Sequence, residues 1–398
     1  MVKKKDKNVI WDFVYNHHNL IYFILITLLA LIARILLFKY NSGDYDLFLR
    51  PWFDALKLNG GISGLSQDIG NYTPIYMTLL AILTYFPVSS LVSIKVLSMI
   101  FDFIGAIAVK KIADELLVGK KYQKQISLLV YAIFLFLPTV LFNSSYWAQS
   151  DSIYTSFVLI SLLYLIRKNY KLSFVFLGIS FAFKLQAIFI LPLYVLMYIA
   201  ERKIKFKYFL FIPLMIFILS LPKAIYSHDL LAGFRVYLNQ AGTYSQYITL
   251  NFPNIYGIFW GDNNNHLINT PFKELSTIGI IITMLVLITL AFLVYIKKTK
   301  FDKKAIIEFG LFSILLTTFF LPQMHERYMF MGDVIALLYL VINIKKYYIP
   351  MVIQFISVNG YMYLLFGSFA IDFSTLSIAF LVLIVFYTKE MYCNYLKL

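Results

Sequence analysis

The chain of 398 residues is poor in charge and has almost no cysteine. Asp, Glu, Lys and Arg make up 14% of the residues, and Cys393 is the only cysteine in the sequence. One cysteine excludes a disulfide framework and a metal site built on several thiolates. The sequence also has no Walker phosphate-binding loop and no GxGxxG element after a strand. We therefore expect no nucleotide-binding site.

What the chain has in abundance is apolar surface. Hydrophobic residues make up 61% of the sequence and the mean hydropathy is +0.76, which is typical of an all-α polytopic membrane protein. Apolar runs recur from Leu20 to Thr388, so we expect residues 1–398 to form one membrane-embedded domain. The net charge of +15 fits basic loops at the cytoplasmic face better than a nucleic-acid partner.

The apolar runs and the basic stretches between them predict a topology. The clear runs cover residues 20–38, 93–109, 125–142, 152–166, 208–225, 277–296, 305–320, 329–343, 349–367 and 373–388. Placing the basic stretches in the cytoplasm puts both termini inside, with a first outer loop over 39–73 and a long outer loop over 226–275. No small-residue cleavage site follows 20–38, so it is expected to be a retained span. We expect about 11–13 transmembrane helices and juxtamembrane helices in both outer loops.

Two segments do not fit simple counting. Segment 74–109 is expected to be a short helix that dips into the membrane, followed by one span; the alternative is two ordinary spans. Segment 172–200 has basic residues on both sides and Lys184 and Gln186 at its centre. We expect two short helices that meet at Lys184, with the ammonium in a polar cavity open to the outside. The alternative is a lysine paired with a buried acid such as Asp102.

The stretch GDYD in the first outer loop places Asp44 and Asp46 two residues apart. In an extended chain both carboxylates face one side, and at a helix start both lie near the positive end of the dipole. Such a carboxylate acts as a general base toward a hydroxyl, or as a metal ligand. The alternative is a solvated or helix-capping acid.

Two more polar clusters fall on the same predicted face. NSSYWAQSDSIYTSF contains Trp147, Gln149 and Asp151, which is richer than the helix cap that Asp151 alone would provide. MHERYMF contains His325, Glu326 and Arg327 in a short loop after a proline, where the arginine fork suits phosphate oxygens. No second histidine stands at the spacing of a zinc motif. The alternative for the second cluster is an ordinary polar turn.

Taken in order, these stretches resemble the GT-C superfamily of integral-membrane glycosyltransferases. SGDYDLFLRPWFDALKLNGG, NYTPIY, YWAQSDSIYTSF, FKLQAIFILPL, NFPNIYG and MHERYMF are similar to bacterial mannosyltransferase-related proteins, distant relatives of the GPI-anchor mannosyltransferases. The resemblance runs along nearly the whole chain.

The resemblance implies inverting transfer of a hexose (mannose, glucose or galactose) from a polyprenyl-phosphate donor to a glycolipid or cell-wall polymer at the outer face of a bacterial plasma membrane. It implies Asp44 as the catalytic base, with Asp46 as second choice. Arg327, Lys184 and His325 are expected at the donor phosphate. Sugar and acceptor contacts are expected from Gln149, Asp151, Trp147, Glu326, Gln186 and Tyr72. No cofactor is certain, although Asp44, Asp46 and Asp151 are candidate ligands for Mg²⁺ or Mn²⁺.

Two other classes of protein share some of these features. A flippase or transporter for lipid-linked sugars also has intramembrane charges, but it should show internal repeats with matching broken helices. The sequence has one such break and no repeat. A polysaccharide polymerase also joins lipid-linked sugars in a large outer loop, yet the paired acids of the first loop favour the glycosyltransferase.

Overall fold

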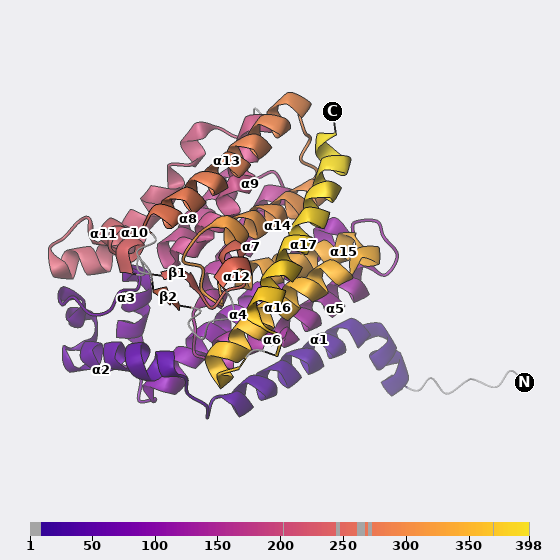
Figure 1. Ribbon diagram of the computed structural model, residues 1–398. Coiled ribbons are helices and arrows are strands. Elements are labelled where there is room, and N and C mark those ends of the chain that lie inside the picture. Colours follow the sequence, from indigo (N-terminus) through magenta and orange to yellow (C-terminus); the bar gives the residue numbers. More distant parts are fainter. Residues whose placement is uncertain are drawn as a thin grey trace, which may run out of the picture.

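The computed structural model describes residues 9–201, 203–243, 247–260, 267–269, 273–368 and 370–397, and it is helical along most of this length (Figure 1). The basic segment 1–7 and part of the long loop, 261–266, lie outside the described residues. The helices are α1 (Val9–Leu37), α2 (Arg50–Leu58), α3 (Pro74–Leu83), α4 (Ser90–Leu116), α5 (Gln123–Phe136), α6 (Pro138–Leu141), α7 (Asp151–Ile166), α8 (Tyr170–Phe183), α9 (Leu191–Ala200), α10 (Phe211–Ser227), α11 (Ala232–Thr243), α12 (Ile255–Trp260), α13 (Lys273–Lys297), α14 (Lys303–Phe320), α15 (Phe330–Ile342), α16 (Tyr348–Phe366) and α17 (Phe373–Met391). Strands β1 (Tyr247–Leu250) and β2 (Leu267–Asn269) pair antiparallel.

Every clear apolar run of the sequence is built as helix, which confirms the all-α polytopic class. The ends of these helices follow local sequence rules. Ser89, Asn169 and Asp302 are N-caps whose side chains accept a hydrogen bond from a backbone N–H of the first turn. Pro138 is the first residue of α6, and the helical stretch that it begins, Pro138–Tyr146, is bent by 51° from α5.

In the described part of the chain, six helices can cross a membrane by length and composition, or up to seven when the bent pair counts as one span. The sequence count of 11–13 is larger because it includes segments that are built as shorter helices. These shorter apolar helices are Pro74–Leu83, Asp151–Ile166, Tyr170–Phe183, Leu185–Ala200 and Phe330–Ile342. Several of them, α7 above all, pack inside the bundle with most of their residues buried.

Both irregular segments have the expected helical breaks. The short helix α3 precedes the 27-residue α4. The second segment breaks at Lys184, whose backbone is extended, with φ −158° and ψ 134°. A 3₁₀ turn over Leu185–Ile190 follows, and α9 then begins with Pro192 in its first turn, where proline is tolerated.

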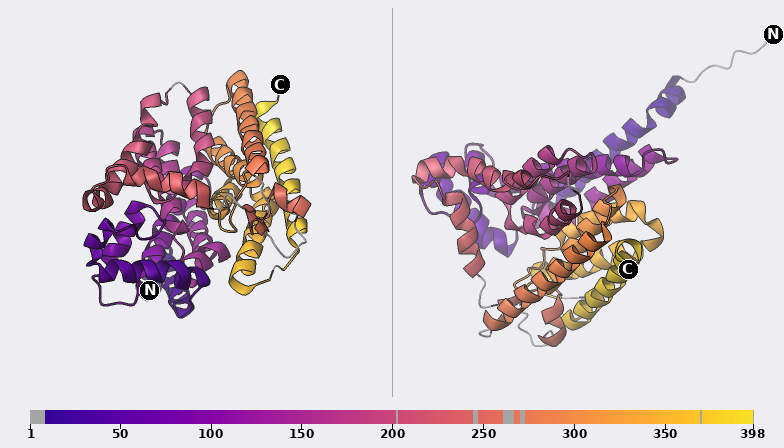
Figure 2. Two further views of the ribbon diagram at one scale, coloured as in Figure 1. Left: turned by 60° about the vertical axis from the view of Figure 1, so that its left-hand side comes forward. Right: turned by 90° about the horizontal axis from the view of Figure 1, so that it is seen from above.

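Three of the predicted basic loops meet at one residue, Glu115. Glu115 accepts hydrogen bonds from Arg167 Nε at 2.8 Å and from Lys303 Nζ at 2.9 Å, which joins three of these loops. Figure 1 shows α2, α3, α11 and the two strands together at the opposite end of the long helices. Figure 2 shows α13–α17, in orange and yellow, packed as a group beside the earlier helices. The polar clusters singled out in the sequence lie at the end that carries the strands.

A small second core supports the first loop. Tyr45, Leu49, Phe53 and Leu56 pack with residues of α3 and α4 and with Ala148 and Ile153, separately from the main core. Ala148 and Ile153 flank the stretch that holds Gln149 and Asp151. Apolar packing therefore fixes the first loop against the 143–151 segment.

Candidate active site

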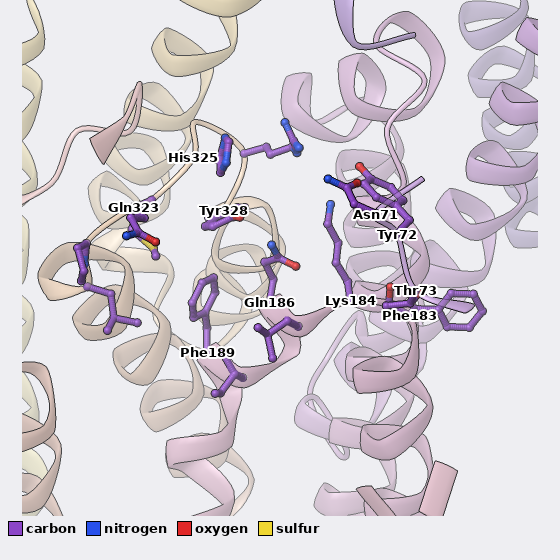
Figure 3. Close-up of a pocket in the computed structure, with 16 residues that line it drawn as sticks. Asn71, Tyr72, Thr73, Phe183, Lys184, Gln186, Phe189, Gln323, His325 and Tyr328 are labelled. Carbon is purple, nitrogen blue, oxygen red and sulfur yellow. Dashed lines mark hydrogen bonds between the residues drawn. The ribbon is translucent and has the colours of Figure 1, made fainter. Parts of the chain in front are cut away.

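Two adjacent cavities open at the end of the bundle that carries the strands. The larger, of about 270 Å³, contains Lys184 and Gln186 among apolar side chains (Figure 3). The smaller, of about 150 Å³, contains Asp44, Trp52 and Gln149. The wall between the two cavities is formed by side chains that line both: Asn71, Tyr72, His325 and Arg327. The two cavities thus bring together the first loop, the helix break at Lys184 and the loop that contains His325, Glu326 and Arg327, here called the HER loop.

Asp44 lines the smaller cavity, and one of its two carboxylate oxygens is held by hydrogen bonds. Its Oδ2 accepts hydrogen bonds from Trp147 Nε1 at 3.1 Å and from Gln149 Nε2 at 2.6 Å. Tyr72 donates its hydroxyl to Gln149 Oε1 at 3.2 Å, which fixes the orientation of that amide. Within the described residues, Asp44 Oδ1 accepts no hydrogen bond. The carboxylate is therefore oriented, with one oxygen available to a ligand.

Asp46 lies apart from Asp44. Asp44 has helical backbone angles and is followed by a π-helical turn over Tyr45–Leu49, so residues two apart point in different directions. The Asp46 side chain is exposed and accepts a hydrogen bond from Asn41 Nδ2 at 2.8 Å. It lines neither cavity. The spacing of the two acids thus places only Asp44 in the site.

Asp151 is fully buried and contacts both Lys184 and Arg327. It receives Lys184 Nζ at Oδ1, at 2.6 Å, and Asn143 Nδ2 at Oδ2, at 2.9 Å. Its Oδ2 also lies 3.7 Å from Arg327 Nε. Lys184 does pair with an acid, but the partner is Asp151 and not Asp102, which corrects the alternative considered from the sequence. Figure 3 shows the Lys184 side chain extending toward Asn71 and Tyr72, across from His325 and Tyr328.

Arg327 is the most heavily contacted cation of the site. Its guanidinium lies over the Trp147 ring, with Cζ 5.3 Å from the centroid. Its Nη1 is 2.9 Å from Glu326 Oε1 and 3.5 Å from Asp44 Oδ2. Burial disfavours its charge, but Glu326 and the other acids around it outweigh that effect and raise the pKa of Arg327 well above its ordinary value. The guanidinium is therefore a fixed positive charge on the wall between the cavities.

The HER loop is held in place by the long loop. Leu250 N donates to Met324 O at 2.9 Å, and Glu326 N donates to Leu250 O at 3.1 Å, so β1 pairs with an extended stretch of the HER loop. Burial lowers the pKa of His325, against the opposing effect of Glu326, whose Oε2 lies 3.7 Å from His325 Nδ1. His325 is thus a neutral imidazole at pH 7, able to donate a hydrogen bond but not to supply a charge.

One buried carboxylate ties the 143–151 segment to the helices beneath it. Asp102 of α4 accepts hydrogen bonds from Ser144 Oγ at 2.5 Å, near the start of the segment, and from Ser152 Oγ, just after its end. Arg34 of α1 neutralises it, with Nε 2.8 Å from Asp102 Oδ2, and both side chains are fully buried. The segment that carries Trp147, Gln149 and Asp151 is therefore fixed at both ends.

The acids proposed as metal ligands do not form a suitable donor set. Asp46 faces solvent, and Asp151 is occupied by Lys184 and Asn143. No group of three His, Cys, Asp or Glu side chains that could hold a metal ion occurs in the described part of the chain. The three acids therefore do not share a site for a divalent cation.

Part of the chain is similar to a protein of known activity. No protein-family model matches the chain. A stretch of 167 residues is 27% identical to GPI mannosyltransferase 1 of Saccharomyces cerevisiae and covers 42% of this chain. The chain is similar to a yeast mannosyltransferase. The match spans only 39% of the length of that protein, so it supports a distant relationship and leaves the activity of the whole chain to be proposed.

Some residues of the site were given no role from the sequence. Trp52, Asn71 and Asn251 line the smaller cavity, and Asn143 holds Asp151. The first three lie inside the quoted stretches SGDYDLFLRPWFDALKLNGG, NYTPIY and NFPNIYG, so the motifs that carried the resemblance did mark their location. Polarity alone could not separate them from ordinary loop residues.

Proposed function

We propose that this protein is an inverting membrane glycosyltransferase that transfers a hexose from a polyprenyl-phosphate donor to an acceptor hydroxyl at the extracytoplasmic face. The observation that carries the proposal is the arrangement around Arg327. A carboxylate with one available oxygen, Asp44, lies on one side of it, and a second cation, Lys184, lines the cavity on the other side. The similarity to a yeast mannosyltransferase supports the same reaction class.

The arrangement supplies what an inverting transfer requires. Asp44 Oδ1 accepts the proton of the acceptor hydroxyl while the hydroxyl oxygen attacks the anomeric carbon of the donor sugar. The bond from that carbon to the phosphate oxygen breaks, and its electron pair stays on the lipid phosphate. Trp147 and Gln149 position Asp44 through its other oxygen. The base therefore stays oriented without losing the lone pair that takes the proton.

The two cations stabilise the leaving group. Arg327 and Lys184 line the larger cavity, where the lipid phosphate is placed, and neutralise its growing charge. His325 donates a hydrogen bond as a neutral imidazole. The apolar side chains of this cavity, including Phe183 and Phe189, suit the first isoprene units of the lipid. Asp151 holds the two cations and is a positioning residue in this proposal rather than a direct sugar ligand.

The test is transfer by the purified protein in nanodiscs. Polyprenyl-phosphate mannose, glucose and galactose are offered separately, with a crude envelope extract as acceptor. Asp44→Asn is expected to lower transfer at least about 100-fold, since the amide cannot take the proton. Donor binding should persist, because Lys184 and Arg327 remain.

The matched control is Asp46→Asn, which removes a carboxylate two residues away that faces solvent. It is expected to transfer like the wild type. Equal transfer by Asp44→Asn and wild type would remove Asp44 as the base. Failure of the wild type with every donor, together with passage of the donor across sealed vesicles, would favour the flippase alternative.

A further inference from the structure

The side chains that line the smaller cavity indicate which class of ligand it binds, which the proposed reaction alone does not specify. Three of its groups make no hydrogen bond within the described residues: Asp44 Oδ1, the side-chain amide of Asn251 and the indole N–H of Trp52. An apolar occupant would leave these groups unpaired when it excluded water, which is costly. The ligand must therefore carry several hydrogen-bonding groups.

Trp52 adds a flat apolar surface to this polar lining. The indole is half-buried and is flanked by Phe48 and Tyr72, with ring centroids 5.9 Å and 5.2 Å away. Gly70 lies against it so closely that a Cβ at position 70 would come within 2.9 Å of the ring. Since the φ of Gly70 is +74°, glycine suits this position for two reasons. The ring is thus fixed in place at the edge of the cavity.

A pyranose ring combines the two properties that this lining requires. Its hydroxyl groups lie around the rim, and its C–H groups form flat apolar faces that stack on aromatic rings. A cavity of about 150 Å³ is also of the size that holds one six-membered ring. A lipid alcohol lacks the rim of hydroxyls, and a serine or threonine side chain lacks the flat face.

We propose that the smaller cavity binds a sugar residue of the acceptor, stacked on Trp52 and hydrogen-bonded to Asn251, with the hydroxyl to be glycosylated at Asp44. The inference rests on the proposed transfer reaction, because Asp44 is taken as its base. It assigns the acceptor to the class of glycans and glycolipids. The position of Asn251 depends on β1, which pairs with the HER loop, so the long loop contributes one side of the acceptor site.

The experiment measures binding without donor, so it does not depend on transfer. Methyl α-D-mannopyranoside, methyl β-D-glucopyranoside and methyl β-D-galactopyranoside are titrated into the nanodisc-embedded protein and followed by saturation-transfer NMR. N-acetylserinamide and 1-butanol serve as peptide and lipid-alcohol probes. At least one glycoside is expected to bind more tightly than either probe, with saturation strongest on the ring protons of one face.

Trp52→Leu is expected to raise the Kd of that glycoside about tenfold, as for the loss of one aromatic contact. Trp52→Phe should retain most of the binding. Phe206→Leu, at an exposed aromatic residue near the basic loops, controls for a general effect of the substitution. Polyprenyl-phosphate binding at the larger cavity and thermal unfolding confirm that Trp52→Leu is folded.

The outcomes separate this inference from the proposed function. Preference for N-acetylserinamide or 1-butanol over every glycoside would overturn the inference, as would unchanged glycoside affinity in folded Trp52→Leu. Transfer activity accompanied by either result would leave the proposed function standing. Glycoside binding that depends on Trp52, in a protein that transfers nothing, would support the sugar site and count against the glycosyltransferase.

Discussion

Asp151 contacts both cations of the proposed phosphate site. It is fully buried and contacts Lys184 at 2.6 Å, and its other oxygen faces Arg327 Nε at 3.7 Å. Removing one partner of a buried ion pair leaves an uncompensated charge. The same carboxylate therefore compensates the charge of two cations and holds them side by side at the proposed phosphate site.

We predict that Asp151→Asn lowers the free energy of unfolding by roughly 3 kcal/mol. A lipid phosphate supplies the missing negative charge, so polyprenyl phosphate should raise the thermal unfolding temperature more in this variant than in wild type. Thermal unfolding in nanodiscs, with and without the lipid phosphate, measures both effects. Asp54→Asn, at an exposed acid paired with Arg50 at 3.7 Å, is the control. Equal lipid-dependent shifts in wild type and Asp151→Asn would contradict the role given to Asp151.

The lowered pKa of His325 predicts that the stability of the protein depends on pH. Burial lowers its pKa below the ordinary value of 6.5, so the unfolded chain binds a proton that the folded protein does not. Stability from this group is complete above about pH 6.5 and is lost as pH falls toward the lower folded pKa. Glu326, whose pKa is lowered below 4.5, acts only in more acidic solution.

The unfolding temperature of the wild type is expected to change between pH 7 and pH 5.5. For His325→Asn we expect a smaller change. Thermal unfolding in nanodiscs at pH 7, 6.5 and 5.5 measures this difference. His228→Asn, at a histidine outside both cavities, serves as the comparison. A wild type that becomes more stable as pH falls through this window would show that His325 is protonated in the folded protein.

At the scale of elements, the sequence predicts which segments are helical and where a helix breaks. Apolar periodicity and length locate the runs, and a lysine with a glutamine at the centre of 172–200 indicates the break that is found at Lys184. These are local signals, and they depend on the segment alone. The clustering of Asp44, Trp147 and Arg327 was also suggested by their common predicted face.

The contacts between side chains that are far apart in the chain could not be predicted from the sequence. Asp102 of α4 pairs with Arg34 of α1 because of how each helix is rotated about its own axis, and that rotation is set by packing along both helices. Strand β1 pairs with the HER loop across a large separation in sequence, and no local pattern encodes that register. The GDYD spacing had two conformational readings, and only the helical one separates Asp46 from the site.

The whole molecule divides its polar groups between two ends. Lys303 and Arg167 meet at Glu115, and Thr299 Oγ1 donates to Tyr395 O at 3.4 Å, so the chain just after Cys393 lies beside one of the basic loops. The two cavities and the first loop lie at the opposite end. If the positive loops face the cytoplasm, the site faces outward, where a lipid-linked sugar and an envelope glycan can meet.

The lone cysteine makes this orientation measurable. Cys393 is exposed at the basic end, and Leu58, 87% exposed, lies in the first loop at the site end. In intact cells, we expect a membrane-impermeant maleimide to label Leu58→Cys in a Cys393→Ser background, and to label wild-type Cys393 only after permeabilisation. The Cys393→Ser protein without a second change is the unlabelled control. Labelling of Cys393 alone in intact cells would reverse the topology and place Asp44 in the cytoplasm.

A soluble nucleotide sugar would then be as accessible to the site as a lipid-linked one. The larger cavity, however, is lined by two cations and by apolar side chains, which fits a lipid phosphate. Outward labelling of Leu58→Cys is therefore the result that the proposed lipid-phosphate donor predicts.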